Sequence, residues 1–196
     1  MEQLSGFTLI TGGVRSGKSA FAEELAYKSG KKTVYLATAR AEDPEMRERV
    51  NQHRRRRPAG VITVEEPLKP HLTLERYSLP GQVILVDCLT LLVTNLFLAD
   101  LESRGAVQQG EDIFADEIIL EQASKKALDY IEHFSATAVA TGAAVLAVTN
   151  EVGMGVVPEY PVGRYFRDTA GRANQIAAAA ADRVYFVVCG IPQRIK

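Results

Sequence analysis

The sequence contains only two cysteines, Cys88 and Cys189, and both lie in apolar runs. Two thiols can form at most one disulfide, and neither belongs to a CxxC pair or to a metal-ligand spacing. The sequence therefore excludes a disulfide scaffold and a cysteine-rich metal site. We expect both cysteines to be buried free thiols, as is usual in a reducing compartment.

The chain also lacks an excess of charge and a long apolar run. Its formal net charge is −1, which argues against a protein that binds polyanions over its whole surface. No apolar run is long enough to span a bilayer, and the first residues do not form a signal-peptide pattern. We expect a cytoplasmic protein with no membrane span and no nucleic-acid partner.

What the sequence does contain is an alternation of strand-like and helix-like segments. Short apolar runs predict strands at residues 7–12, 33–38, 61–66, 82–87, 144–149 and 183–188. Amphipathic or capped segments predict helices at residues 17–29, 44–56, 89–102, 112–140 and 164–181. This alternation predicts an α/β fold whose sheet is mostly parallel, with helices on both faces. Because no linker divides the chain, we expect a single domain over residues 1–196.

Two connecting segments and the C-terminal end have a distinct composition. Pro67, Pro70 and Pro80 break up the segment after the third strand. Residues 103–111 are polar, contain two glycines and are the best candidate for a mobile loop. The last residues, "GIPQRIK", predict a short antiparallel edge strand at the C-terminus.

The strongest motif is "GGVRSGKS", which fits the phosphate-binding pattern G-x-x-x-x-G-K-[ST] between a predicted strand and a predicted helix. Backbone N–H groups of such a loop close around phosphate oxygens, and the helix N-terminus adds a favourable dipole. Lys18 is expected to reach the β- and γ-phosphates, and the Ser19 hydroxyl to bind Mg²⁺. The motif predicts a P-loop NTPase (RecA-like) fold. The nucleotide-binding residues that it predicts are Gly12, Gly13, Val14, Arg15, Ser16, Gly17, Lys18 and Ser19.

A carboxylate at the end of another buried strand is the usual companion of a P-loop. The run "ILVD" places Asp87 at such a position. We expect Asp87 to be the second Mg²⁺-associated residue beside Ser19.

One histidine stands beside four arginines in "NQHRRRRP", residues 51–58. Met46, Val50 and His53 share one helical face, which should be the inward one. Arg57 precedes Pro58 and is pushed out of helical geometry. Positive neighbours keep His53 neutral and nucleophilic, which suggests a covalent histidine–phosphorus intermediate. A solvated basic helix end and a hydrogen-bonded core histidine remain open alternatives.

The other two histidines, His71 and His133, have no comparable neighbours in the sequence. His71 sits in a proline-flanked connection, and His133 sits near the end of the long predicted helix. We expect both to be ordinary surface residues.

Six segments together resemble one family, the bifunctional adenosylcobinamide kinases / adenosylcobinamide-phosphate guanylyltransferases of cobalamin biosynthesis. They are "TGGVRSGKSAFAE", "VYLATA", "EMRERVNQHRRRRP", "VDCLTLLVTNL", "VTNEVGMGVVPEYPVGRYFRDTAGRANQ" and "AADRVYFVVCGIPQRIK". The P-loop is shared by many NTPases, whereas "VTNEVGMGVVPE" and "RDTAGRANQ" are far more specific. The resemblance runs nearly end to end.

The resemblance implies two reactions: phosphorylation of adenosylcobinamide by a nucleoside triphosphate, and transfer of GMP from GTP to that phosphate. It implies Mg²⁺, GTP and ATP at the site, a guanylylated His53, and a homo-oligomer, with a trimer as the expected assembly. Beyond the P-loop, it places nucleotide contacts on Thr38, Ala39, Arg40, Arg54, Arg55, Arg56, Arg57, Glu65 and Asp87. The chain departs from the family pattern in having Val50 in place of Ile and only arginines between His53 and Pro58.

Two other functions remain to be weighed. A P-loop small-molecule kinase would leave His53 structural and would form no covalent GMP adduct. A nucleotide switch or DNA-associated P-loop protein would use the arginines on phosphate backbones, against the near-neutral charge. The Gly- and Pro-rich residues 150–163 are either a corrinoid or subunit contact or a long surface connection.

Overall fold

The computed structural model describes residues 4–40, 57–104 and 116–196. Its centre is a seven-stranded sheet in the order β3-β2-β4-β5-β1-β6-β7. Six strands run parallel, and β7 pairs antiparallel with β6 at one edge. The strands are β1 (Phe7–Gly12), β2 (Lys32–Ala37), β3 (Ile62–Glu65), β4 (Gln82–Asp87), β5 (Ala144–Val148), β6 (Arg183–Val188) and β7 (Ile191–Arg194).

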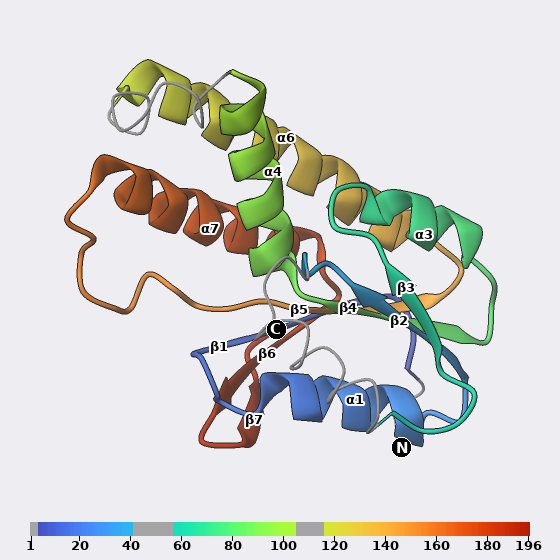
Figure 1. Cartoon of the computed structure of the whole chain (residues 1–196). Coiled ribbons are helices and arrows are strands. Elements are labelled where there is room, and N and C mark those ends of the chain that lie inside the picture. The colour runs from blue at the N-terminus through green and yellow to red at the C-terminus, as the bar shows by residue number, and fades with distance from the viewer. Residues whose placement is uncertain (1–3, 41–56, 105–115) are drawn as a thin grey trace.

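Helices cover both faces of this sheet (Figure 1). Helix α1 (Lys18–Lys28) lies on one face. On the other face lie α3 (Pro70–Arg76), α4 (Leu89–Ser103), α6 (Glu117–Ala140) and α7 (Pro161–Ala180). The predicted fold class, a mostly parallel α/β sheet with an antiparallel C-terminal edge strand, is confirmed. The predicted helix at 44–56, with His53 and Arg54 to Arg56, lies outside the described residues, as do residues 105–111 of the predicted loop.

The central strands are buried on both faces, which explains their continuous apolar sequence. Successive side chains of β1 alternate between two apolar clusters. Phe7 and Leu9 pack in the cluster shared with α4, α6 and α7, and Ile10 packs in the cluster shared with α1. This alternation fixes the register of the strand that leads into the P-loop.

Two helices begin at prolines that the sequence analysis placed outside helices. Helix α3 starts at Pro70, in a segment where no helix was predicted, and α7 starts at Pro161 and not at residue 164. Proline is well tolerated at the first helical position, because the N–H that it lacks has no partner there and its φ is already suitable. The sequence analysis therefore misjudged these prolines.

The two cysteines have different environments. Cys88 is buried at the end of β4, as predicted, whereas Cys189 is exposed in the turn between β6 and β7. The prediction for Cys189 is wrong, because the apolar run of β6 ends at Val188 and the chain then reverses direction. Both thiols are free, as predicted.

No helix in the described part of the chain is both long enough and apolar enough to cross a membrane.

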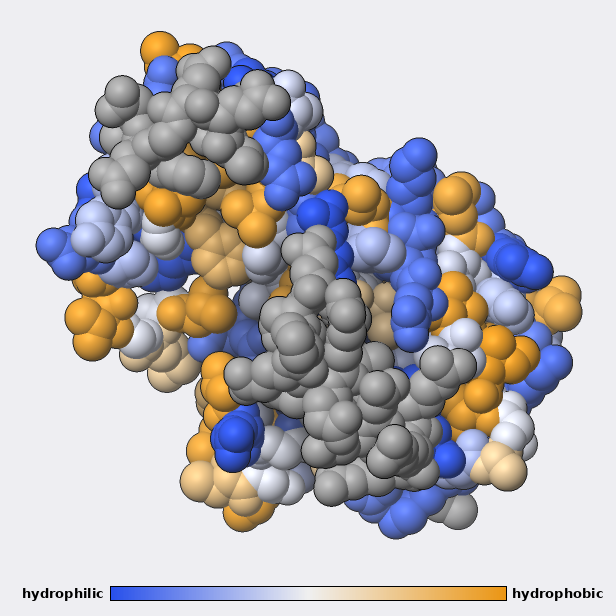
Figure 2. Space-filling view, in the orientation of Figure 1, coloured by the Kyte–Doolittle hydropathy of each residue, from blue (hydrophilic) through white to orange (hydrophobic). Residues whose placement is uncertain are grey.

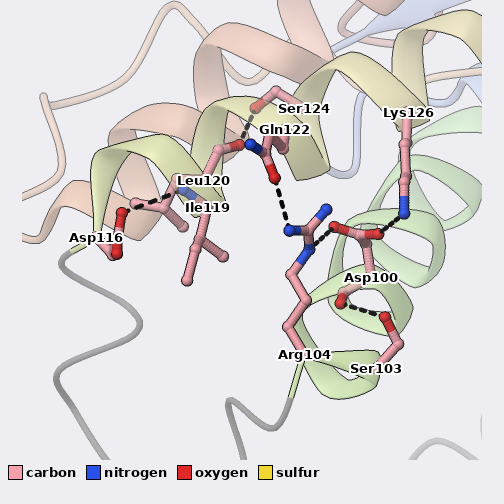
Figure 3. A network of polar contacts seen from close by, with 9 residues as sticks. All are labelled: Asp100, Ser103, Arg104, Asp116, Ile119, Leu120, Gln122, Ser124 and Lys126. Carbon is pink, nitrogen blue, oxygen red and sulfur yellow. Dashed lines mark hydrogen bonds and ion pairs between the residues drawn. The ribbon is translucent and has the colours of Figure 1, made fainter.

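A buried carboxylate joins α4 to α6 (Figure 3). The Asp100 side chain is 5% exposed and accepts hydrogen bonds from Arg104 Nε, at 2.7 Å, and from Lys126 Nζ. Arg104 also donates from Nη1 to Gln122 Oε1 at 2.6 Å. Burial raises the pKa of Asp100, but the hydrogen bonds from Lys126 and Arg104 outweigh burial and leave that pKa below its ordinary value. The network thus holds the two helices together through an ionised Asp100.

Replacement of Asp100 by Asn should lower the free energy of unfolding by about 2 kcal/mol at neutral pH, because two charge-assisted hydrogen bonds lose their charged acceptor. Solvent around the outer ends of Arg104 and Lys126 keeps this figure below that of a fully buried pair. Since the native pKa of Asp100 is lowered, its contribution is present above the ordinary value of 3.8 and is lost as the pH falls through the native value.

Urea unfolding of wild type and Asp100→Asn between about pH 7 and about pH 3 measures this contribution. The difference should shrink on acidification. Asp129→Asn removes an exposed carboxylate from α6, the helix that carries Lys126, and should change stability little. Equal losses in the two variants would contradict the assignment.

Candidate active site

The P-loop connects β1 to α1 and closes against the turn between β6 and β7. The Gly190 N–H donates to the Ser16 carbonyl oxygen at 2.8 Å. A Cβ on Gly12 would lie 2.4 Å from the Val187 carbonyl oxygen, and a Cβ on Gly17 would lie 3.0 Å from the Gly190 Cα. Gly17 also has a φ of 97°. Both motif glycines are therefore required by the close approach of β6 and its turn, before any nucleotide is considered.

Lys18 is the first residue of α1 and is only 7% exposed. Its ammonium lies across the loop, where Nζ donates to the Gly13 carbonyl oxygen at 2.8 Å. Burial lowers the pKa of Lys18 below its ordinary value, although the nearby Cys88 and Asp87 act in the opposite direction. The Ser16 hydroxyl is buried in the same loop and has no partner among the described residues. The loop thus presents one cation and an unpaired hydroxyl at the N-terminus of a helix, which is a suitable environment for phosphate oxygens.

Asp87 ends β4 and is held by a tyrosine that the sequence analysis missed. The Tyr35 hydroxyl on β2 donates to Asp87 Oδ2 at 2.6 Å. Burial, and then the neighbouring Asp87, raise the pKa of Tyr35 well above its ordinary value, so the hydroxyl stays a donor. The one signal in the sequence is a tyrosine inside an otherwise aliphatic buried strand, "TVYLA".

Arg57 joins this pair by stacking on the face of the Tyr35 ring. Its guanidinium carbon lies 3.5 Å from the Tyr35 ring centroid, and Nη1 donates to Thr63 Oγ1 at 2.8 Å. A cation stacked on an aromatic face is attracted to the ring electrons. The structure therefore links two residues of the predicted site, Arg57 and Asp87, through Tyr35.

The remaining predicted nucleotide residues lie at the carboxyl ends of β2 and β3. Thr38 is fully buried, and its hydroxyl donates to the Cys88 carbonyl oxygen at 2.7 Å and accepts from the Cys88 N–H at 2.8 Å. Its side chain therefore joins β2 to β4. Arg40 is half-buried beyond Ala39, with Nη1 4.0 Å from Glu102 Oε2 on α4. Glu65 is exposed at the end of the outermost strand, β3, opposite Ala37.

The predicted Mg²⁺ ligands are the Ser19 hydroxyl, at the start of α1, and the Asp87 carboxylate. Mg²⁺ prefers oxygen ligands and usually combines one or two protein groups with phosphate oxygens and water, so this small donor set fits the ion. Among residues 4–40, 57–104 and 116–196, no cluster of three or more His, Cys, Asp or Glu side chains suits a metal. The assignment of Ser19 and Asp87 as Mg²⁺ ligands stays a prediction.

A further polar network at the end of β5 escaped the sequence analysis. Thr149 is buried and donates from Oγ1 to Asn174 Oδ1 at 2.7 Å. Its oxygen lies 3.1 Å from Thr90 Oγ1. Thr90 accepts from the Asn150 N–H at 2.7 Å, and Asn174 Nδ2 donates to the Asn150 carbonyl oxygen at 3.0 Å. The available signal was the polar pair that directly follows the buried run "AVLAV", just as a polar residue, Asp87, ends β4.

The two other histidines lie on α3 and α6. His133 is exposed, as predicted, whereas His71 is half-buried. The two rings pack together, with centroids 4.9 Å apart. His71 Nδ1 lies 2.6 Å from the Tyr130 hydroxyl oxygen.

Replacing Gly12 by Ala should lower the free energy of unfolding by about 3 kcal/mol or abolish folding, because the new Cβ would overlap the Val187 carbonyl oxygen. Replacing Gly13 by Ala should leave it near the wild-type value, since nothing lies within 4 Å of the new Cβ. Thermal unfolding without nucleotide compares the two variants. Equal stability would contradict a steric requirement for Gly12.

The chain is similar to known proteins over nearly its whole length. A family model described as cobinamide kinase / cobinamide phosphate guanyltransferase matches residues 8–195. The bifunctional adenosylcobalamin biosynthesis protein CobP of Pseudomonas aeruginosa is 41% identical over 188 residues, 96% of each chain. Proteins of the same description named CobU, from Escherichia coli and Salmonella typhimurium, are also 41% identical, over 96% of this chain and 98% of their own. The chain therefore belongs to the cobinamide kinase / cobinamide phosphate guanyltransferase family.

Proposed function

We propose that the protein phosphorylates adenosylcobinamide with a nucleoside triphosphate and then transfers GMP from GTP to that phosphate, giving adenosylcobinamide-GDP and pyrophosphate. The observation that carries the proposal is the buried Lys18 of a complete P-loop beside Asp87, in a chain that the family model covers over residues 8–195. The curated relatives are described as bifunctional. Two transfers from one triphosphate site fit that description.

In the kinase reaction the P-loop positions the triphosphate. Backbone N–H groups at the start of α1 and the Lys18 ammonium face the β- and γ-phosphates, and phosphoryl transfer depends mainly on such positioning and charge. Ser19 and Asp87 would hold Mg²⁺, which would offset the negative charge of the phosphates. The tyrosine hydrogen bond fixes the direction in which the Asp87 carboxylate points. The hydroxyl of adenosylcobinamide attacks the γ-phosphorus, and the nucleoside diphosphate leaves.

In the guanylyl transfer, His53 is the proposed nucleophile. A ring nitrogen attacks the α-phosphorus of GTP, the bond to the β-phosphate oxygen breaks, and pyrophosphate leaves on the P-loop. An oxygen of the cobinamide phosphate then attacks the same phosphorus and releases the histidine. Support comes from Arg57, which is stacked on Tyr35 beside Asp87 and follows His53 by four positions. Four residues of extended chain reach about 14 Å at most, so the position of Arg57 limits how far away the proposed nucleophile can act.

The proposed covalent step predicts that α-labelled GTP will leave acid-labile label on the wild-type protein and none on His53→Ala. The label is acid-labile because a phosphorus–nitrogen bond to imidazole hydrolyses in acid. His71→Ala is the matched control, because it removes a histidine on α3 that is hydrogen-bonded to Tyr130. This variant should be labelled as strongly as the wild type.

Two outcomes of this labelling experiment would contradict the proposal. Undiminished label on His53→Ala would eliminate His53 as the nucleophile. Absence of label on the wild type, together with phosphorylation of adenosylcobinamide, would identify a simple P-loop kinase in which His53 is structural.

The connection between β5 and α7 is the proposed contact for the corrinoid. It carries apolar side chains that are strongly exposed, with Met154 80% and Val156 94% accessible. Figure 2 shows this apolar surface on the left, where the connection runs in Figure 1. Exposed apolar side chains gathered in one loop often mark a binding surface. The family resemblance further implies a homo-oligomer, with a trimer expected, so a neighbouring subunit is the competing occupant.

Replacement of Met154 by Lys should raise the KM for adenosylcobinamide about tenfold, because a charge would replace apolar contact area with the corrinoid. GMP labelling of the protein should not change, since the P-loop is intact. Steady-state kinetics with the labelling assay separates the two effects. Val139→Lys, which places the same charge at an exposed apolar position on α6, is the control and should leave the KM unchanged. An unchanged KM in Met154→Lys would remove this loop from the corrinoid site.

A further inference from the structure

Strand β5 lies between the strand that carries the P-loop and the strand that ends at Asp87. Val148, the last residue of β5, is level with Asp87 in the β4–β5 pairing. On the other side, Thr149 donates its N–H to the Ile10 carbonyl oxygen, and Glu151 donates to the Gly12 carbonyl oxygen at 3.0 Å. The residue between them, Asn150, is therefore fixed beside the first glycine of the P-loop.

The backbone of Asn150 is held from two more directions. Its N–H donates to Thr90 Oγ1 at 2.7 Å, and its carbonyl oxygen accepts from Asn174 Nδ2 at 3.0 Å. Thr90 lies on α4 and Asn174 on α7, so two helices and the neighbouring strand all define the position of one residue. Thr149 ties these partners together, because its hydroxyl contacts both Thr90 and Asn174. Such multiple support is typical of residues whose side chains must be placed accurately.

The side chain of Asn150 takes no part in this network. Its amide makes no hydrogen bond to any residue that the structure describes, although both of its backbone groups are paired. It is half-buried at the edge of the sheet where Lys18 and Asp87 lie. A side-chain amide offers two N–H donors without adding charge, which suits a phosphate oxygen already faced by Lys18.

We infer that Asn150 reads the terminal phosphate: its side-chain amide donates a hydrogen bond to a γ-phosphate oxygen of the bound nucleotide. This inference rests on the proposed function only in that the P-loop binds a nucleoside triphosphate. The contact makes the site distinguish GTP from GDP, because a diphosphate lacks the group that the amide meets. Thr90 and Asn174 act through Asn150 and are positioning residues.

The test compares the affinities of GTP and GDP, measured by titration calorimetry in the presence of Mg²⁺, for wild type, Asn150→Ala, Asn150→Asp and Gln175→Ala. Asn150→Ala should weaken GTP binding about tenfold or more, as expected for the loss of a hydrogen bond to a charged group, and leave GDP binding unchanged. Asn150→Asp keeps the size of the side chain and should weaken GTP binding further, because a carboxylate repels the phosphate. Gln175→Ala changes an exposed neighbour of Asn174 on α7 and should bind both nucleotides as wild type does.

The outcomes separate this inference from the proposed function. Equal weakening of GTP and GDP in Asn150→Ala, or no change in either, would overturn the inference, since the amide would then support the fold or do nothing. A wild-type protein that binds neither nucleotide would overturn the inference and the proposed function together. A wild type that binds GTP with an Asn150-dependent preference, yet acquires no GMP label, would support the inference while the guanylyl transfer fails.

Discussion

Parallel pairing of β1, β5 and β4 brings the P-loop, the Asn150 region and Asp87 to a single edge of the sheet. Parallel strands deliver their carboxyl ends to the same side, and ligands of open α/β sheets bind there. The backbone bonds that Thr149 and Glu151 make to Ile10 and Gly12 continue this pairing past the last strand residue. If β5 were displaced, the loop proposed to bind phosphate and the acid proposed to bind Mg²⁺ would no longer lie at the same edge.

The charges at this edge depend on that geometry. Lys18 is buried and its pKa is lowered by burial, while Asp87 lies close enough to oppose the shift. Tyr35 donates to Asp87 and stacks on Arg57, so a cation, an aromatic ring and a carboxylate are in contact in one group. A buried cation and a nearby carboxylate suit the proposed site, which would bind a triphosphate and then release pyrophosphate or a nucleoside diphosphate.

The α4–α6–α7 layer supplies support from one face of the sheet. Asp100 ties α4 to α6 through Arg104 and Lys126, and Thr169 on α7 donates to Ser124 on α6. Thr90 on α4 and Asn174 on α7 connect this layer to the end of β5 through their hydrogen bonds to Asn150. Helices α4, α6 and α7 are thus held to one another by hydrogen bonds as well as by apolar packing.

Local periodicity and contiguous motifs predicted the strands, most of the described helices, the antiparallel edge strand, the P-loop and the acid at the end of β4, but not helix α3. The sequence analysis misjudged Pro70, Pro161 and Cys189, where position within a helix or a turn decides and composition does not. Only the tertiary structure decided that Tyr35 meets Asp87, that Gly12 must be glycine because of Val187, and that Thr90 and Asn174 converge on Asn150. These contacts join residues that are far apart in the chain. Their distances in space depend on the order of the strands in the sheet, which a single sequence does not specify.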